Sequence, residues 1–228
     1  MIERLAWDSD FFGYEVGRAR IAPDAFSIEN LQVEGSGFDL IHVLSSDPLP
    51  GLALVDVKIV LDREIPESPS APRIPVERFQ GKANDQLKRL ALESGIHSRF
   101  RVDPAFTNGE FERLYMRWLD NSLERPGELV LVTQDELGLT GFVSLAHGDA
   151  SSSIGLIAVD ARARGKGVGS ALLDASFVAV REASKKRITV VTQEANEAAM
   201  VLYARAGFQV IERTCIHHFR PKSGHASA

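Results

Sequence analysis

The amino-acid sequence predicts an α/β fold built on a mixed, largely antiparallel sheet with helices on both faces. Two observations carry this prediction. In the C-terminal half, segments with helical and strand patterns follow one another as helix, three strands, helix, strand, helix and strand. The first sixty residues add short runs rich in Val, Ile and Leu that are bounded by Gly, Pro and Asp, which is typical of strands. The N-terminal region should therefore be a smaller α/β addition to the same protein.

Composition and charge limit the class of protein. The chain has 228 residues, 44% of them hydrophobic and 25% charged, which is ordinary for a soluble globular protein of one large or two small domains. A net charge of -5 argues against nucleic acid or an acidic membrane as partner. The N-terminus lacks the pattern of a signal peptide, no run approaches the roughly 20 apolar residues of a membrane helix, and Cys215 has no second cysteine to pair with. We expect a cytoplasmic protein.

The N-terminal region is predicted to end in a proline-rich connector. Strands are expected at residues 11–16, 38–46 and 52–61. Prolines then recur at every third position, and each fixes its own backbone angle and disfavours helix in the residue before it. These prolines are Pro66, Pro69, Pro72 and Pro75. The predicted division is an N-terminal region over residues 1–95 with its connector at 62–76, a second domain over 96–221, and a disordered tail over 222–228.

Two helices are predicted after the connector. A short one has its apolar residues on one face and ends at Gly95, because glycine readily terminates helices. A longer one spans about residues 108–124, where Thr107 and Glu110 have the spacing of a capping box and an apolar stripe follows. The remaining elements are predicted as strands at 128–134, 140–147 and 153–159, a helix at 170–183, a strand at 187–193, a helix at 196–206 and a strand at 208–219.

A basic, glycine-rich loop between a strand and a helix is the most informative segment. The start of a helix offers unpaired N–H groups and the positive end of the helix dipole, and glycines let an anion approach the backbone. The glycines are Gly165, Gly167 and Gly169, and the nearby cations are Arg162, Arg164 and Lys166. The pattern favours a phosphate or pyrophosphate site over a plain turn with solvated basic residues. The spacing fits neither a P-loop nor a dinucleotide-binding loop.

The run Arg164-Gly165-Lys166-Gly167-Val168-Gly169 after a strand resembles the [R/Q]xxGx[G/A] signature of the GCN5-related N-acetyltransferase (GNAT) family. This resemblance implies an acyl-CoA N-acyltransferase whose sheet is splayed where the cosubstrate, acetyl-CoA, enters, with the transferase domain over residues 96–221. It also implies that the loop amides hold the coenzyme A pyrophosphate and that the preceding strand pairs with the pantetheine arm. The implied acetyl-CoA-binding residues are Leu156, Ile157, Ala158, Val159, Arg164, Gly165, Lys166, Gly167, Val168, Gly169, Ser170, Asn196 and Tyr203.

The pair Asn196 and Tyr203 extends the resemblance. Residues seven apart on a helix share nearly the same face, so both can line one groove. In the family, the asparagine contacts the cofactor arm and the tyrosine protonates the departing thiolate, which makes Tyr203 the predicted catalytic residue. A phenol suits this role because it is a proton donor at neutral pH. The alternative is that Tyr203 packs in the core and Gly207 caps the helix.

A narrower similarity concerns the acceptor. Residues 7–13, 98–101, 114–118 and 191–196 look like the corresponding stretches of the dTDP-fucosamine acetyltransferases, which acetylate a 4-amino-4,6-dideoxy sugar attached to a thymidine nucleotide. The similarity implies a small-molecule acceptor of the nucleotide-sugar class. Candidate contacts, chosen as aromatic residues for the base and cations for the diphosphate, are Trp7, Phe11, Phe12, Arg99 and Arg101.

Several points stay open in the sequence. The amine would attack the thioester directly, and backbone N–H groups of Leu156 to Ala158 could polarise the carbonyl. The group that takes the proton from the amine could be His147, Asp149 or Glu194, each of which lies at a predicted strand end. Other readings are a transferase for a different amine, such as a polyamine or a protein N-terminus, and a non-catalytic acyl-CoA sensor. A homodimer is compatible with the sequence.

No metal site is predicted. Cys215, His217 and His218 are close in sequence, but they lack the spacing of strong zinc sites. On a strand the first two would share one face and His218 would point to the other.

Overall fold

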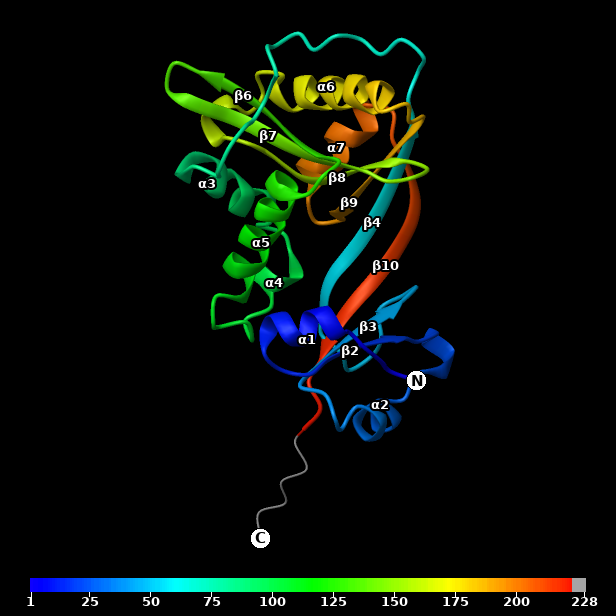
Figure 1. Ribbon diagram of the computed structural model, residues 1–228. Helices are drawn as coiled ribbons and strands as arrows, with labels where there is room; N and C mark the ends of the chain where they lie inside the picture. The colour runs from blue at the N-terminus through cyan, green and yellow to red at the C-terminus, as the bar shows by residue number, and fades with distance from the viewer. Residues whose placement is uncertain (223–228) are drawn as a thin grey trace. The chain divides into compact units, whose positions relative to one another are not determined.

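A computed structural model describes residues 1–222 and divides into two compact units (Figure 1). Unit 1 consists of Met1–Lys58 and the C-terminal segment from Glu212 onward, and unit 2 consists of Ile59–Ile211. The predicted disordered tail lies, from residue 223 on, outside the described residues. A domain boundary at residue 95 stays a prediction, whereas the compact units meet along the chain near residues 58 and 211.

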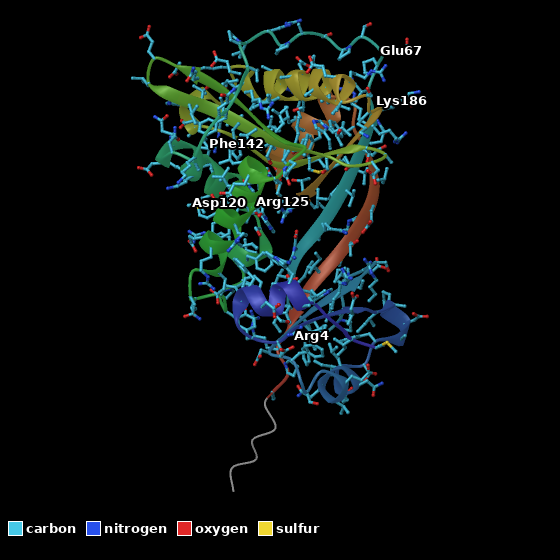
Figure 2. All side chains as sticks on the ribbon, viewed as in Figure 1. Arg4, Glu67, Asp120, Arg125, Phe142 and Lys186 are labelled. Carbon is cyan, nitrogen blue, oxygen red and sulfur yellow. The ribbon has the colours of Figure 1, made fainter. Side chains whose placement is uncertain are left out.

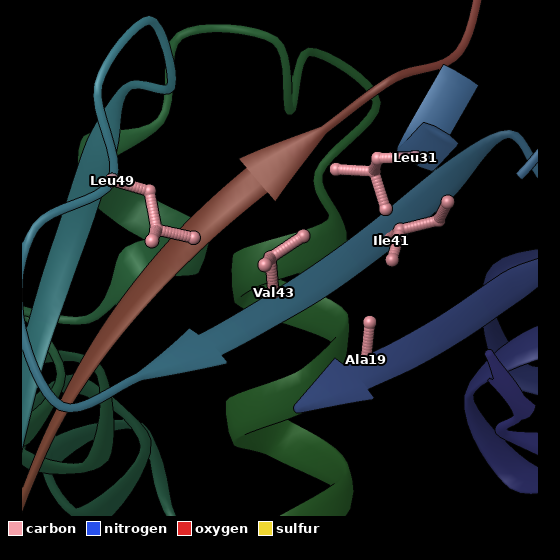
Figure 3. Packing of buried hydrophobic residues seen from close by; sticks show 5 residues of the cluster. All are labelled: Ala19, Leu31, Ile41, Val43 and Leu49. Atoms are coloured by element: carbon pink, nitrogen blue, oxygen red, sulfur yellow. The ribbon is translucent and has the colours of Figure 1, made fainter. Parts of the chain in front are cut away.

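Unit 1 is a small α/β unit. Its elements are β1 (Glu3–Arg4), α1 (Ala6–Phe12), β2 (Val16–Arg20), a 3-10 turn (Pro23–Ala25), α2 (Ile28–Glu34), β3 (Leu40–Ser45) and parts of β4 (Leu54–Glu64) and β10 (Gln209–Phe219). Strand β2 pairs in parallel with β3, and β1 and β10 pair antiparallel with β2 and β3 respectively. Figure 3 shows the core of this unit, formed by Ala19, Leu31, Ile41, Val43 and Leu49. Burial of these apolar side chains is the main favourable term in its folding.

The predicted strand at residues 11–16 is wrong. Phe11 and Phe12 end helix α1, and β2 begins only at Val16. The cause is Gly13, which adopts the left-handed conformation at φ 80° and donates its N–H to the Ser9 carbonyl, the usual way in which glycine ends a helix. The aromatic and β-branched residues of this stretch favour a strand, but the helix-ending glycine has the stronger effect on the local structure.

Unit 2 confirms the predicted order of elements. They are β5 (Glu77–Arg78), α3 (Asp85–Ser94), α4 (Arg99–Val102), α5 (Glu110–Glu124), β6 (Glu128–Asp135), β7 (Gly138–His147), β8 (Ser152–Val159), a 3-10 turn (Ala161–Ala163), α6 (Val168–Glu182), β9 (Arg187–Gln193) and α7 (Glu197–Arg205). Strands β5 to β8 pair antiparallel, and β8 pairs in parallel with β9. Helix α6 lies on one side of β6–β8, and α3 and α5 lie on the other (Figure 1). Phe142 of β7 is fully buried between these layers (Figure 2). The fold class expected from the sequence is confirmed.

The helix ends in unit 2 follow local side-chain chemistry. Helix α3 begins where the Asn84 side chain accepts the Leu87 N–H, and it ends at Gly95, as predicted. The capping box predicted for α5 is wrong, because Gly109 in the left-handed conformation (φ 70°) precedes the helix and no side chain caps it. The Glu110 carboxylate instead accepts the N–H of Asn108 at 2.7 Å. The predicted connector at residues 62–76 begins too early, because β4 continues to Glu64, but residues 65–76 contain neither helix nor strand, as expected from the prolines.

Strands β8 and β9 separate along their length, which confirms the predicted splay of the sheet. They pair only from Ser152–Ile154 to Ile188–Val190, although β8 continues to Val159 and β9 to Gln193. On its other edge β8 carries a bulge, where the register with β7 shifts between Val143 and Leu145. The sheet therefore opens at its middle, and backbone groups of β8 become available on one edge.

Within residues 1–222, no helix combines the length and apolar character needed to cross a bilayer.

Candidate active site

Two hollows of unit 2 meet where β8 and β9 part. A cavity of about 460 Å³, here called the acceptor cavity, is lined by residues of α3, α5, β6, β8, β9 and α7, among others. A second hollow of about 500 Å³, here called the donor groove, runs along the end of β8, the basic loop and the starts of α6 and α7. Ser94 and Ile157 line both of them. Two molecules bound in these hollows would meet at the splayed edge of β8.

The glycine loop forms one end of the donor groove. Gly165 and Gly167 adopt left-handed conformations, at φ 73° and 85°, and Gly167 precedes α6 without any side-chain cap. A Cβ added at Gly165 would meet no atom within 4 Å, so the loop is open on that side. The first N–H groups of a helix have no partner within it, so α6 presents donors to the groove. Gly169 and Ser170 of the first turn line the groove too. This arrangement fits the diphosphate of acetyl-CoA.

The cations around the loop are divided. Arg164 lines the groove, where its guanidinium lies 2.5 Å from the Glu93 carboxylate. Arg162 turns away from it: its guanidinium donates to Asp135 at 2.5 Å, which holds the pKa of that carboxyl below its usual range. The expectation that three cations surround one point is therefore wrong for Arg162. Lys166 is exposed and is not among the residues that line the groove. Arg205 of α7 lines it instead, which the sequence interpretation missed.

The other predicted acetyl-CoA residues lie along both hollows. Residues 157–159 of β8 and Val168 of α6 line the donor groove, whereas Leu156 lines the acceptor cavity. Asn196 lines the groove, but its side-chain oxygen caps α7 by accepting the Ala199 N–H at 3.2 Å. Only the amide NH₂ of Asn196 remains to donate to a ligand.

Tyr203 is buried, at 2% exposure, and lines the acceptor cavity. Its ring packs edge-on against Phe208, with 5.4 Å between ring centroids. Burial raises the pKa of the Tyr203 phenol, so the hydroxyl keeps its proton at neutral pH. The ring therefore packs in the core, as the alternative interpretation expects, and the side chain also lines the cavity, whereas the role as proton donor stays a prediction.

At the bulge in β8, one of the backbone N–H groups expected to polarise the thioester carbonyl already has a hydrogen-bond acceptor. Gly155 and Leu156 lie opposite Ser144 of β7, and the Leu156 N–H donates to the Ser144 hydroxyl at 2.8 Å. Ser144 is 1% exposed. The expectation for the Leu156 amide is therefore wrong, since this donor is already used inside the sheet.

The predicted acceptor residues fall into two groups. Arg99 lines the acceptor cavity, with its guanidinium 4.5 Å from the centre of the Phe100 ring. Arg101 lies outside that lining, 3.8 Å from the Glu112 carboxylate, so the structure does not bring it to the cavity. Trp7, Phe11 and Phe12 belong to α1 in unit 1.

The aromatic residues of α1 differ among themselves. Trp7 is 47% exposed and stacks on Phe11 at 4.9 Å, whereas Phe12 is 8% exposed and belongs to a core. Burial argues against a ligand contact for Phe12. A role of Trp7 and Phe11 in acceptor binding stays a prediction.

None of the three residues considered as bases lines the acceptor cavity. The ring nitrogen Nδ1 of His147 lies 2.8 Å from the Ser152 hydroxyl, and burial lowers the pKa of this histidine. The carbonyl of Asp149 accepts from Lys185. Sequence reasoning missed several polar residues that do line the cavity. Asn121, Arg125 and Glu128 are among them, and they come from the end of α5 and the start of β6, where no motif marks them.

Among residues 1–222, no group of three or more His, Cys, Asp or Glu side chains is arranged to hold a metal ion.

Comparison with known proteins adds a family and two relatives. Residues 126–210 match a family model described as an acetyltransferase (GNAT) domain. Mycothiol acetyltransferase of Propionibacterium freudenreichii subsp. shermanii is 38% identical over 172 residues, which cover 70% of this chain and 53% of the relative. The spore coat polysaccharide biosynthesis protein SpsD of Bacillus subtilis is 27% identical over 138 residues, covering 60% of this chain and 47% of the relative. The chain thus spans about half the length of these two curated relatives.

A solved structure supports the fold. The GCN5-related N-acetyltransferase from Sphaerobacter thermophilus superposes with a TM-score of 0.55 at 20% identity, over 80% of this chain and 61% of that chain. At this identity the likeness concerns the fold alone.

Proposed function

Because this chain contains a domain of the GNAT acetyltransferase family, we propose that the whole protein is an N-acetyltransferase for a small-molecule amine. Enzymes of this family are acyltransferases that use acetyl-CoA, which supports the GNAT resemblance and the predicted acetyl donor for the domain at residues 126–210. The narrower resemblance to the dTDP-fucosamine acetyltransferases stays a proposal. The observation that carries the proposal is the junction of the two hollows at Ser94 and Ile157, beside the buried Tyr203. It supports a reaction between one molecule in each hollow.

The proposed mechanism is direct transfer. The residues of β8 and α6 would hold the donor in its groove, so that the thioester carbonyl lies at the splayed edge of β8. A neutral amine in the acceptor cavity forms the new N–C bond while the C–S bond breaks. The Tyr203 phenol donates its proton to the departing sulfur, the amine proton passes to solvent, and the phenolate takes a proton back from solvent. The Leu156 N–H donates to the Ser144 hydroxyl and so cannot polarise the thioester carbonyl. We propose that the N–H of Ile157 does so instead.

For the acceptor we propose an amino sugar linked to a nucleotide, of the dTDP-4-amino-4,6-dideoxyhexose type. Arg99 supports this choice because it lines the acceptor cavity and can bind a diphosphate. A relative named for spore coat polysaccharide biosynthesis is in keeping with a sugar substrate. A second candidate is the acceptor of mycothiol acetyltransferase, favoured by the 38% identity to that enzyme.

The test is the release of coenzyme A thiol from acetyl-CoA with a panel of amines. The panel contains dTDP- and UDP-linked 4-amino-4,6-dideoxyhexoses, unacetylated mycothiol, spermidine and a peptide with a free N-terminus. We expect release with one of the sugar-containing amines. Release with the peptide or spermidine alone would reject the sugar acceptor and keep the transferase. No release with any amine, together with measured acetyl-CoA binding, would favour a non-catalytic acyl-CoA sensor.

A further inference from the structure

The turn between α5 and β6 forms one wall of the acceptor cavity. Its four residues run from Arg125 to Glu128, and the Glu128 N–H donates to the Arg125 carbonyl at 3.2 Å. Gly127 adopts φ 83°, which a side chain would disfavour. Arg125, at the end of α5 (Figure 2), and Glu128, at the start of β6, both line the cavity. A tight turn therefore holds a cation and a carboxylate on the same wall.

Both charged groups are available to a ligand. Among the residues that the structure describes, neither the Arg125 guanidinium nor the Glu128 carboxylate has a hydrogen-bond or ion-pair partner. Asn121 and Ser153 line the cavity as well and bring further polar groups. In the donor groove, by contrast, Arg164 is paired with Glu93.

The charge of the cavity disfavours a polycationic acceptor. The lining of the cavity contains two guanidinium groups, those of Arg99 and Arg125, and one carboxylate, that of Glu128. This local excess of positive charge lies in a chain of net charge -5. A polyamine would be repelled, whereas a ligand rich in hydroxyl or anionic oxygen atoms would be attracted.

The sheet register places Glu128 far from the reacting end of the cavity. Glu128 pairs with Ala146, and Ala146 pairs with Ser153, so the three form one row across β6, β7 and β8. Strands lie about 4.8 Å apart and rise about 3.3 Å per residue, which puts the backbone of Glu128 about 15 Å from that of Ile157. A base must lie within about 3 Å of the proton that it takes. Glu128 must therefore contact a different part of the acceptor.

We propose that Arg125 and Glu128 form a second subsite, which binds a polyhydroxylated group of the acceptor roughly 10 Å from its reacting amine. The carboxylate accepts hydrogen bonds from hydroxyl groups, and the guanidinium donates to their oxygen atoms. The acceptor is then an elongated amine whose sugar-like group lies apart from its nitrogen, and small amines that lack this group bind at the reacting end alone. In a nucleotide-linked amino sugar the hydroxyl groups share the ring with the amine, so the subsite favours the second candidate acceptor, that of mycothiol acetyltransferase. This inference rests on the proposed transferase function and narrows its substrate class.

The test compares Glu128→Gln and Arg125→Ala with the wild type. The probes are dTDP-4-amino-4,6-dideoxygalactose, unacetylated mycothiol and ethanolamine, a short amine without the sugar-like group. We expect the KM of the accepted sugar probe to rise about tenfold in each variant, with kcat within about twofold and the KM of acetyl-CoA unchanged. The slow reaction of ethanolamine should be the same in all proteins. The matched controls are Glu124→Gln and Arg117→Ala, which change exposed residues of α5 outside the cavity lining.

Several outcomes would reject the subsite. An unchanged KM for both sugar probes would reject it. A decrease in kcat without a change in KM would also reject it, because that result assigns Glu128 to the chemical step. Efficient acetylation of spermidine that depends on Glu128 would reject the sugar-like ligand. Calorimetric titration of each sugar probe separates this proposal from the transferase proposal. Binding that weakens in Glu128→Gln without any turnover keeps the subsite and rejects the transferase, and equal binding rejects the subsite.

Discussion

At the scale of single residues, burial decides the chemistry of the titratable groups. Tyr203 and His217 are both almost inaccessible to water, at 2% and 0% exposure. Burial disfavours the charged form of each, so it raises the pKa of the phenol and lowers that of the imidazole. The first effect keeps the phenol protonated and makes it a weaker acid, and the second makes stability depend on pH.

Replacing Tyr203 tests its role as proton donor. We expect Tyr203→Phe to keep acetyl-CoA affinity and the fold, because the ring still packs on Phe208, while kcat falls about tenfold or more, a rise of roughly 1.4 kcal/mol in barrier. The measurements are thiol release and calorimetric titration with acetyl-CoA. Tyr14→Phe, which removes a phenol from unit 1, is the control. Unchanged turnover in Tyr203→Phe would remove this residue from the mechanism.

His217 should make the protein less stable in mild acid. Its Nε2 accepts the Leu49 N–H at 3.1 Å, which requires the neutral ring. Because burial lowers its pKa in the folded state, the unfolded chain binds more protons, and stability falls as pH drops below the ordinary histidine value of about 6.5. We expect the free energy of unfolding in urea to decrease from pH 7 to pH 5, and to decrease less in His217→Gln. Equal slopes in the two proteins would contradict this assignment.

At the scale of elements, the parting of β8 from β9 creates the site. Three paired positions hold the two strands together, and beyond them the donor groove and the acceptor cavity occupy the gap. The bulge opposite Ser144 changes which β8 groups face the gap. The shape of the two hollows thus depends on residues, such as Ser144, that do not line them.

Ser144 is expected to stabilise the bulge. In Ser144→Ala the buried Leu156 N–H loses its acceptor, and leaving such a group unpaired costs about 1–3 kcal/mol. We expect urea unfolding to show a loss of this size and Ser144→Thr, which keeps the hydroxyl, to recover part of it. Ser153→Ala, on the neighbouring strand, is the control for removal of a serine hydroxyl. If Ser144→Ala is as stable as the wild type, the hydrogen bond does not support the bulge.

At the scale of the whole molecule, ligand binding and stability are linked. A ligand that binds only the folded state stabilises it by an amount set by its concentration relative to Kd, about 2.7 kcal/mol at 100 times Kd. We expect acetyl-CoA to raise Tm in a concentration-dependent way. Gly165→Val should weaken this shift, because the glycine has φ 73° in the loop that faces the groove. Gly81→Val, at a glycine of similar conformation outside both hollows, is the control. Equal shifts in all three proteins would place the donor elsewhere.

The sequence alone predicted the order of elements in unit 2, and it singled out the glycine loop and Tyr203, which line the two hollows. These predictions depend on local patterns: hydrophobic period, glycine positions and a motif of six consecutive residues, 164–169. Local rules failed where two signals competed, as at Gly13, which ends a helix inside a strand-like run, and at Gly109, which displaces the predicted capping box.

Only the tertiary structure decided which side chains face the site. Arg162 and Arg164 are two residues apart, yet one is bound to Asp135 and the other lines the groove. The acceptor cavity joins Glu128 to Tyr203, which are distant in sequence, through the register of β6, β7 and β8. Side-chain direction and strand register result from long-range packing, because each depends on partners that the local sequence does not contain. The residues that line the acceptor cavity could therefore be identified only from the fold, whereas the glycine loop was recognisable in the sequence.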